Sequence, residues 1–122
     1  MADFSFDKSR RLLKAADFTP VFEKAEYKVS SRELLFLSIP NRLPHPRLGL
    51  VIAKKNVRLA AQRNRVKRVI RESFRLNQGA IPNLDIVVLA KRRIDLMDNK
   101  ALHQSITKMW QQLQRKSISK PH

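Results

Sequence analysis

Residues 53–75 read AKKNVRLAAQRNRVKRVIRESFR, and this stretch determines more of the fold than any other part of the chain. From Lys54 to Arg75 it contains nine basic residues and a single acidic one, Glu72. Its apolar residues recur at helical spacing, which predicts an amphipathic helix over about Arg58–Asn77. One face of that helix would enter a core, and the other would present positive charge to a polyanion.

The two faces of this predicted helix separate clearly on a helical wheel. The apolar side holds Leu59, Val66, Val69, Ile70, Ser73 and Phe74. The opposite side holds Asn64, Arg65, Lys67, Arg68, Arg71 and Arg75. With one acid among nine bases, ion pairs within the helix cannot neutralise this face. Guanidinium groups bind phosphate in a forked geometry, and an asparagine side chain can reach a base edge or a 2′-hydroxyl.

The rest of the sequence predicts one α/β domain over residues 1–122. A short helix is expected over Ala16–Lys24, with Asp17 as its N-cap. The other predicted elements are strands at Tyr27–Ser30, Glu33–Ile39, Arg47–Ala53 and Leu84–Ala90 and a last helix at Asn99–Lys116. The order α-β-β-β-α-β-α predicts a two-layer α/β sandwich in which the strands before and after the long helix run parallel.

Several details of these elements are also predicted. The strand Glu33–Ile39 is apolar on both sides, so cover is expected on both of its faces. Gly79 is expected to end the long helix in the left-handed conformation. Residues 1–11 and 117–122 are expected to be flexible.

The net charge of the chain is +16, from 26 basic and 10 acidic residues, and it favours a polyanionic partner that releases counterions on binding. An anionic membrane surface is the other option. However, no apolar run approaches the roughly 20 residues that span a bilayer, and the apolar face of the long helix is needed for the core. The absence of cysteine and of a signal-peptide pattern favours the cytoplasm.

The sequence offers little for protein-centred catalysis. Its three histidines, His45, His103 and His122, do not pair at ligand spacing. Asp95 and Asp98 flank a predicted helix start, so we interpret them as capping residues and not as metal ligands. No Gly-rich phosphate loop or nucleophile elbow is present. We therefore predict no catalytic residue and no metal site in the chain.

Aromatic residues suggest a second surface. Phe18 and Phe22 lie one turn apart on the first predicted helix, and Leu35 and Leu37 share one face of the second strand. A helix laid beside a sheet leaves a groove in which exposed aromatic rings can stack on single-stranded bases. The alternative, that both phenylalanines are ordinary core residues, stays open at this point.

At this point the sequence shows a resemblance to a known family. The segment RNRVKRVIRESFR, residues 63–75, resembles the arginine-rich signature of the protein subunit of bacterial ribonuclease P. Three more segments are similar to that family: RLLKAADFTPVF at 11–22, PRLGLVIAKKNV at 46–57 and DIVVLAKR at 85–92. The resemblance extends over about residues 10–115, which is nearly the whole chain.

The resemblance implies a ribonucleoprotein enzyme in which a large RNA performs catalysis with Mg²⁺. The protein is then a monomeric cofactor, one per catalytic RNA, for removal of the 5′ leader from precursor tRNA. Contact with the catalytic RNA is implied for Arg63, Asn64, Arg65, Lys67, Arg68, Arg71 and Arg75. A groove for the leader is implied at Phe18, Phe22, Leu35, Leu37, Lys55 and Arg92. The resemblance also implies a left-handed crossover between parallel strands, as in the ribosomal-protein-S5-domain-2-like fold. A structural RNA-binding protein of ribosomal type is the alternative function.

Overall fold

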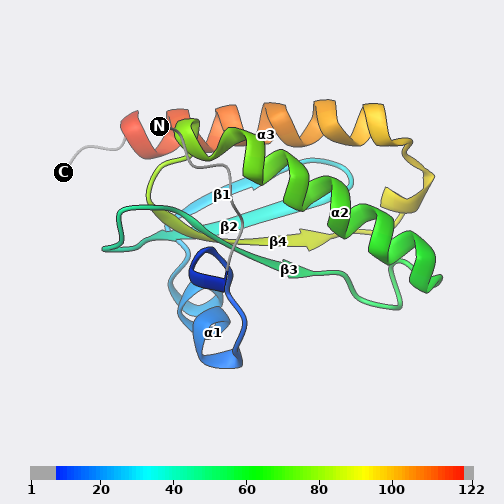
Figure 1. Cartoon of the computed structure of the whole chain (residues 1–122), viewed down its shortest axis with the longest axis horizontal. Coiled ribbons are helices and arrows are strands. Elements are labelled where there is room, and N and C mark those ends of the chain that lie inside the picture. The colour runs from blue at the N-terminus through cyan, green and yellow to red at the C-terminus, as the bar shows by residue number, and fades with distance from the viewer. Residues whose placement is uncertain (1–7, 120–122) are drawn as a thin grey trace.

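The computed structural model describes residues 8–119 as a four-stranded sheet with helices on both faces (Figure 1). In chain order the elements are η1 (Lys8–Arg10), α1 (Ala15–Lys24), β1 (Tyr27–Ser30), β2 (Leu34–Pro40), β3 (Arg47–Val51), α2 (Ala60–Asn77), η2 (Gln78–Ala80), β4 (Leu84–Ala90), η3 (Ile94–Leu96) and α3 (Asn99–Ser119). Helices α2 and α3 lie side by side over one face of the sheet, and α1 lies on the other. The predicted class and order of the elements are confirmed.

The sheet has the strand order β1-β2-β4-β3. Strand β2 pairs antiparallel with both β1 and β4, whereas β3 and β4 pair parallel and are joined through α2. In Figure 1, β3 lies in front of β4, both strands point to the right, and α2 returns to the left above them. This path is a left-handed crossover, which departs from the usual right-handed connection and agrees with the family resemblance.

The main core lies between the sheet and the two long helices. Phe36 of β2 packs against Trp110 of α3 with ring centroids 4.6 Å apart, and Phe74 of α2 meets the same indole at 6.0 Å. Ser73 lies on the buried side of α2 because its Oγ accepts a hydrogen bond of 2.9 Å from Nε1 of Trp110. The predicted apolar face of α2 is thus confirmed, except that Leu59 precedes the helix and is 66% exposed.

Replacing Ser73 with alanine is expected to lower the free energy of unfolding by about 1–3 kcal/mol, because it removes the acceptor from a buried indole N–H. Urea denaturation measures this change. In a Trp110→Phe background, which lacks that donor, the same substitution should cost much less. An equal cost in both backgrounds would show that the hydrogen bond contributes nothing.

The second face of the sheet is only partly covered. A smaller apolar cluster there is centred on Leu12, Val21 and Val87. Along β2, the side chains of Leu34, Phe36 and Ser38 are buried, whereas those of Leu35, Leu37 and Ile39 are half-buried. The predicted cover on both faces is therefore confirmed for the face toward α2 and α3 and holds only in part on this side, since α1 is too short to shield the whole strand.

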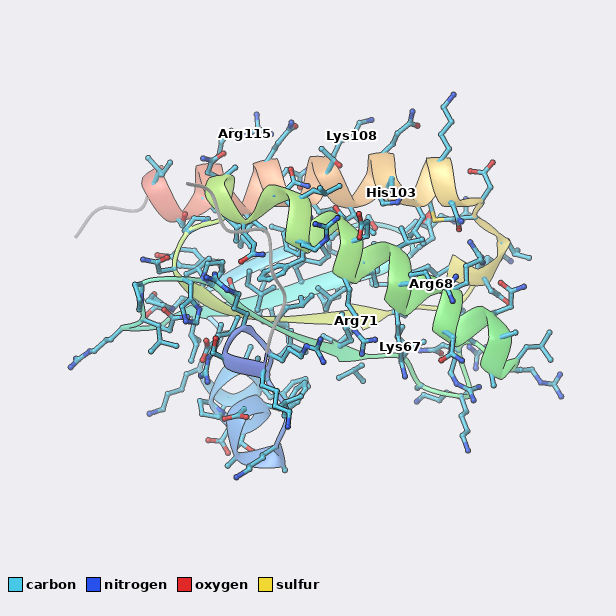
Figure 2. All side chains as sticks on the ribbon, viewed as in Figure 1. Lys67, Arg68, Arg71, His103, Lys108 and Arg115 are labelled. Atoms are coloured by element: carbon cyan, nitrogen blue, oxygen red, sulfur yellow. The ribbon has the colours of Figure 1, made fainter. Side chains whose placement is uncertain are left out.

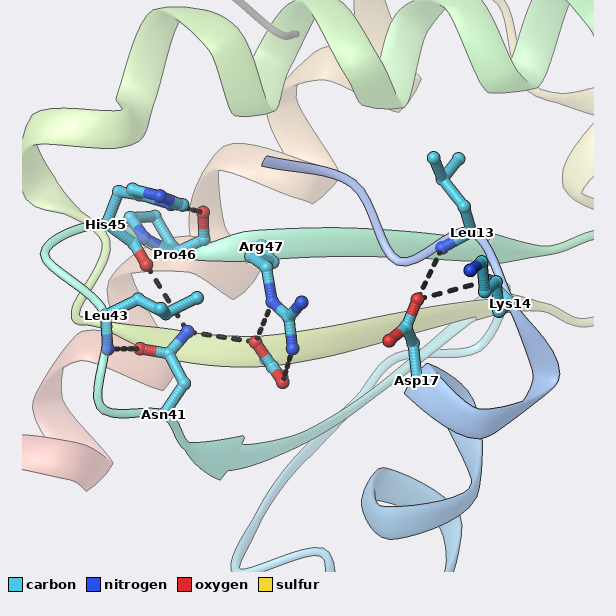
Figure 3. Close-up of polar contacts among 9 residues, drawn as sticks. Leu13, Lys14, Asp17, Asn41, Leu43, His45, Pro46 and Arg47 are labelled. Carbon is cyan, nitrogen blue, oxygen red and sulfur yellow. Dashed lines mark hydrogen bonds and ion pairs between the residues drawn. The ribbon is translucent and has the colours of Figure 1, made fainter. Parts of the chain in front are cut away.

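Helix α1 begins at Ala15, one residue earlier than predicted, so Asp17 lies in its first turn and is not the N-cap residue. The Asp17 carboxylate nevertheless accepts hydrogen bonds of 3.1 Å from the backbone N–H groups of Leu13 and Lys14 (Figure 3). These two bonds stabilise the ionised form and lower the pKa of the Asp17 carboxyl. The predicted capping role is thus performed from inside the helix.

This stabilisation is expected to depend on pH. The folded pKa of Asp17 lies below its ordinary value of 3.8. The contribution of the Asp17 charge to the free energy of unfolding is therefore fully present above pH 3.8 and is lost as the pH falls through the folded pKa. Asp17→Asn should lower the free energy of unfolding by about 0.5–1 kcal/mol near pH 7 and by less near pH 2. Urea denaturation at the two pH values tests this, and an equal difference at both would contradict a role for the charge.

A polar cluster fixes the start of β3 beside β4 (Figure 3). Asp85, which is 7% exposed, accepts hydrogen bonds from Nε and Nη2 of Arg47 at 2.8 and 2.6 Å. Its Oδ1 also accepts one from Nδ2 of Asn41 at 2.9 Å. These contacts hold the loop between β2 and β3 against the start of β4.

The chain ends differ from the prediction. The segment expected to be flexible is ordered from Lys8, because Arg11 forms a parallel bridge to Leu48. Residues 1–7 and 120–122 lie outside the described part of the chain. Helix α3 extends through Ser119, so the expected flexible tail is wrong for residues 117–119. Gly79 is not left-handed, since α2 continues into the short 3₁₀ helix η2.

Candidate RNA interface

The exposed face of α2 contains an open depression of 390 Å³. It is bordered by Asn64, Lys67, Arg68, Arg71, Glu72 and Arg75. Figure 2 shows Lys67, Arg68 and Arg71 projecting from α2, the helix in front of the sheet. None of these three cations forms a hydrogen bond or an ion pair with another residue in the range 8–119. Their charge is therefore available to an external anion.

Arg75 differs from its neighbours because it is neutralised within the helix. Its Nη2 lies 2.6 Å from Oε1 of Glu72, and its Nε donates a second hydrogen bond of 3.3 Å to Oε2. The hydrogen bond from Arg75 lowers the pKa of the Glu72 carboxyl and thereby keeps it ionised. Of the cations predicted to bind RNA, Arg75 is the one whose charge is offset by an acid in the described structure.

Arg63 and Arg65, which begin the arginine-rich signature, are bound to other parts of the chain. Arg63 donates to backbone oxygens in the segment that precedes α2. Arg65 donates to Gln62, to the backbone oxygen of Asp95 in η3 and to the side chain of Asn99, the first residue of α3. Both are half-buried, so neither presents its whole guanidinium group to solvent.

The aromatic part of the predicted leader groove lies on the half-covered face of the sheet. The rings of Phe18 and Phe22 stack with centroids 6.4 Å apart, and Phe22 is 47% exposed. Phe18 and Leu37 both pack against the smaller cluster, while Leu35 lies two residues along the same face of β2. The structure therefore brings these four residues to one face and excludes an ordinary core position for Phe22.

The cationic part of that groove lies elsewhere, in a cavity of 770 Å³ at the carboxyl ends of β3 and β4. It is bordered by Lys55, Asn56, Arg58, Leu59, Arg92 and Asp95. None of the four apolar groove residues borders this cavity. The predicted groove thus consists of an apolar sheet face and a separate cationic end.

A third cavity, of 220 Å³, links the two predicted surfaces and was not predicted. Phe18 borders it from α1, and Lys67 and Arg71 border it from α2. Its remaining lining comes from Arg11, Leu12, Leu13, Leu48, Gly49 and Leu50. Gly49 was the available signal, because a glycine inside a strand often marks a close approach of other atoms.

The expectations about metals and caps concern Asp95, which borders the cationic cavity, and Asp98, which directly precedes α3. Asp98 caps α3, because its Oδ1 accepts a hydrogen bond of 2.7 Å from the backbone N–H of Ala101. The capping interpretation of Asp98 is thus confirmed. Within residues 8–119, no three His, Cys, Asp or Glu side chains are grouped as a metal ion would require. A search of the same residues finds no helix with the length and apolar character needed to cross a membrane.

Comparison of the sequence with protein families gives a match to the ribonuclease P family over residues 6–114. The ribonuclease P protein component of Chromohalobacter salexigens is 48% identical over 115 residues, which are 94% of this chain and 90% of that protein. The corresponding protein of Pseudomonas aeruginosa PAO1 is 50% identical over 115 residues, covering 94% of this chain and 85% of the relative.

Comparison of the fold gives the same result. The RNase P protein of Staphylococcus aureus superposes with a TM-score of 0.79 at 30% identity, over 85% of this chain and 94% of that one. The RNase P protein of Thermotoga maritima superposes with a TM-score of 0.74 at 28% identity, over 84% and 96% of the two chains. The sheet and helices described above are therefore shared with these solved structures.

Proposed function

The chain belongs to the ribonuclease P protein family, and from that premise we propose that it is the protein cofactor of the ribonucleoprotein enzyme. It binds the catalytic RNA and precursor tRNA and supports RNA-catalysed cleavage that removes the 5′ leader. The observation that carries the proposal is the cationic face formed by Lys67, Arg68 and Arg71, none of which is paired with another of residues 8–119. No residue of the chain is assigned to the chemical step.

The α2 face is the proposed binding surface for the catalytic RNA. Its contact residues are Asn64, Lys67, Arg68, Arg71 and Arg75. Closely spaced phosphates repel one another, and cations fixed on a helix reduce that repulsion and release counterions on binding. We expect this screening to lower the concentration of Mg²⁺ that the RNA needs.

The leader of precursor tRNA is proposed to bind in extended form along the half-covered sheet face. Phe22 presents an exposed ring for stacking, and stacking on an aromatic ring tolerates every base. Phe18, Leu35 and Leu37 extend the apolar surface, and Lys55 and Arg92 supply charge at its end. Mature tRNA lacks the leader and so lacks these contacts, which favours the substrate over the product.

Two other functions fit the structure less well. A lipid-binding helix needs a free apolar face, but Val66, Val69 and Ile70 of α2 are 0%, 5% and 0% exposed. A ribosomal-type structural protein would explain the charge of α2. It would not explain the family match over residues 6–114.

The assembly is proposed to contain one copy of the protein per catalytic RNA and to work in the cytoplasm. The cationic face belongs to a single helix, so one copy presents the entire RNA surface. Sedimentation of the reconstituted particle measures the ratio directly. A mass with two protein copies per RNA would contradict the proposed stoichiometry.

Reconstitution tests the proposed function. Protein alone is expected to leave precursor tRNA intact, and RNA alone to cleave it only at high Mg²⁺. The two together should cleave at low Mg²⁺ and release a mature 5′ end. Primer extension locates the cleavage site. A particle no more active than RNA alone, at any Mg²⁺ concentration, would contradict the proposal, as would crosslinking in lysate to ribosomal RNA without precursor tRNA.

A further inference from the structure

Arg65 is held by hydrogen bonds from all three nitrogens of its guanidinium group. Its Nε donates to Oε1 of Gln62 at 2.8 Å. Its Nη1 donates to Oδ1 of Asn99 at 2.9 Å, and its Nη2 donates to the backbone oxygen of Asp95 at 3.1 Å. The planar group therefore joins α2 to η3, in the segment that follows β4, and to the first residue of α3.

Arg63 connects α2 to a different segment in a similar way, through hydrogen bonds to backbone oxygens. Its Nη1 donates to the backbone oxygens of Val57 and Arg58 at 3.0 and 2.9 Å. These two residues belong to the segment between β3 and α2. The two arginines therefore hold two different loops against one rigid helix.

The same two loops border the cationic cavity at the ends of β3 and β4. One loop contributes Lys55 and Arg58, and the other contributes Arg92. Three cations and one carboxylate, that of Asp95, border this cavity, so the cations outnumber the anion and the two loops would tend to separate without a connection between them. The hydrogen bonds from Arg63 and Arg65 to uncharged oxygens supply such a connection without neutralising the cations of the cavity.

The second loop has a conformation that neighbouring contacts must maintain. Arg93 has a φ of 73°, in the left-handed region that residues other than glycine seldom adopt. It lies between Arg92, which borders the cavity, and Asp95, whose backbone oxygen binds Arg65. The bond from Arg65 thus acts close to the least favourable backbone conformation of this loop.

We infer that Arg65, with Arg63, is a positioning residue that holds both loops so that Lys55, Arg58 and Arg92 converge on a phosphate of the substrate RNA. The inference rests on the proposed function. The inference assigns two different roles to residues of the arginine-rich signature, residues 63–75. The arginines that begin the signature organise the substrate end, and the later cations of α2 bind the catalytic RNA.

The salt dependence of RNA binding separates these roles. Each phosphate contact that is lost flattens the plot of log K against log salt concentration by about 0.7–0.9. With the full chain and the catalytic RNA, Arg68→Ala is expected to flatten this plot by that amount. Arg65→Ala should leave the slope unchanged, because its guanidinium binds the protein.

Turnover of the holoenzyme gives the second measurement. Arg65→Ala is expected to raise KM for precursor tRNA about tenfold, the loss for one misplaced charge-assisted contact, with the change in KM and not in kcat. Arg65→Lys keeps the charge but cannot reproduce the planar fork. It should therefore resemble Arg65→Ala, whereas a phosphate-binding role would let lysine restore most of the wild-type KM.

The outcomes decide between the two roles. A slope that falls in Arg65→Ala as much as in Arg68→Ala, or a wild-type KM in Arg65→Lys, would overturn the inference. Should Arg65→Ala fail to fold, as thermal melting by circular dichroism would show, Arg65→Lys carries the KM test. If Arg68→Ala leaves the slope unchanged while both Arg65 results hold, the proposed RNA interface fails and the inference stands.

Discussion

Replacing Arg68 and Arg71 together with glutamate is expected to weaken binding of the catalytic RNA by at least about 100-fold at physiological salt. Both side chains border the open depression on α2, and neither is paired within the described chain. The substitutions remove two charge-assisted contacts and place two anions against phosphates. Filter binding with labelled RNA measures the change, and the salt slope should fall by roughly 1.5 at the same time.

The matched control is Lys108→Glu with Arg115→Glu on α3. Both side chains are exposed, and Figure 2 shows them on the helix beside α2. This pair changes the net charge by the same amount but leaves the α2 face intact. Binding should weaken by less than about threefold, the effect of a distant and screened charge. Equal losses from both pairs would show that total charge, and not the α2 face, determines affinity.

The long helix and the central strands were predictable because their signals are local. The apolar and cationic faces of α2 repeat with the helical period, and this sorted buried Ile70 from exposed Arg68 without any long-range information. The predicted bounds of strand β4, Leu84–Ala90, match the observed ones, because an apolar run interrupted only by Asp85 has sharp ends. Local periodicity thus accounts for the elements and for most of the proposed RNA face.

The parts that were missed depend on contacts between distant segments. Asp95 and Asn99 follow Arg65 by 30 and 34 residues, so no spacing rule relates them. The left-handed crossover follows from how the sheet is covered, and only the family resemblance indicated it. The half-covered face of β2 arises because α1 is short, although the strand itself is apolar on both sides. Sequence patterns therefore predict helices and strands better than they predict the contacts and grooves that form between them.

Gly49→Ala is expected to destabilise the fold by about 1–3 kcal/mol and to reduce the preference of the holoenzyme for precursor over mature tRNA. A Cβ at this position would lie 2.6 Å from Cε1 and 2.8 Å from Cζ of Phe18. It would also lie 3.0 Å from Cβ of Leu12. The ring must therefore move away from β3, and it would carry its stacked neighbour Phe22 with it. Urea denaturation and competition between the two tRNAs measure the two effects.

Gly79→Ala is the matched control, because a Cβ there meets no atom within 4 Å and the residue has no positive φ. It should leave tRNA preference unchanged and keep or slightly raise stability, by about 0.4–1 kcal/mol at most. In a Phe18→Ala background, Gly49→Ala should lose most of its cost, since the ring that it displaces is gone. Affinity for the catalytic RNA should stay at the wild-type level in every one of these variants. If Gly49→Ala instead weakened RNA binding and left the leader preference intact, Phe18 would belong to the RNA interface, and the division between the two surfaces would be wrong.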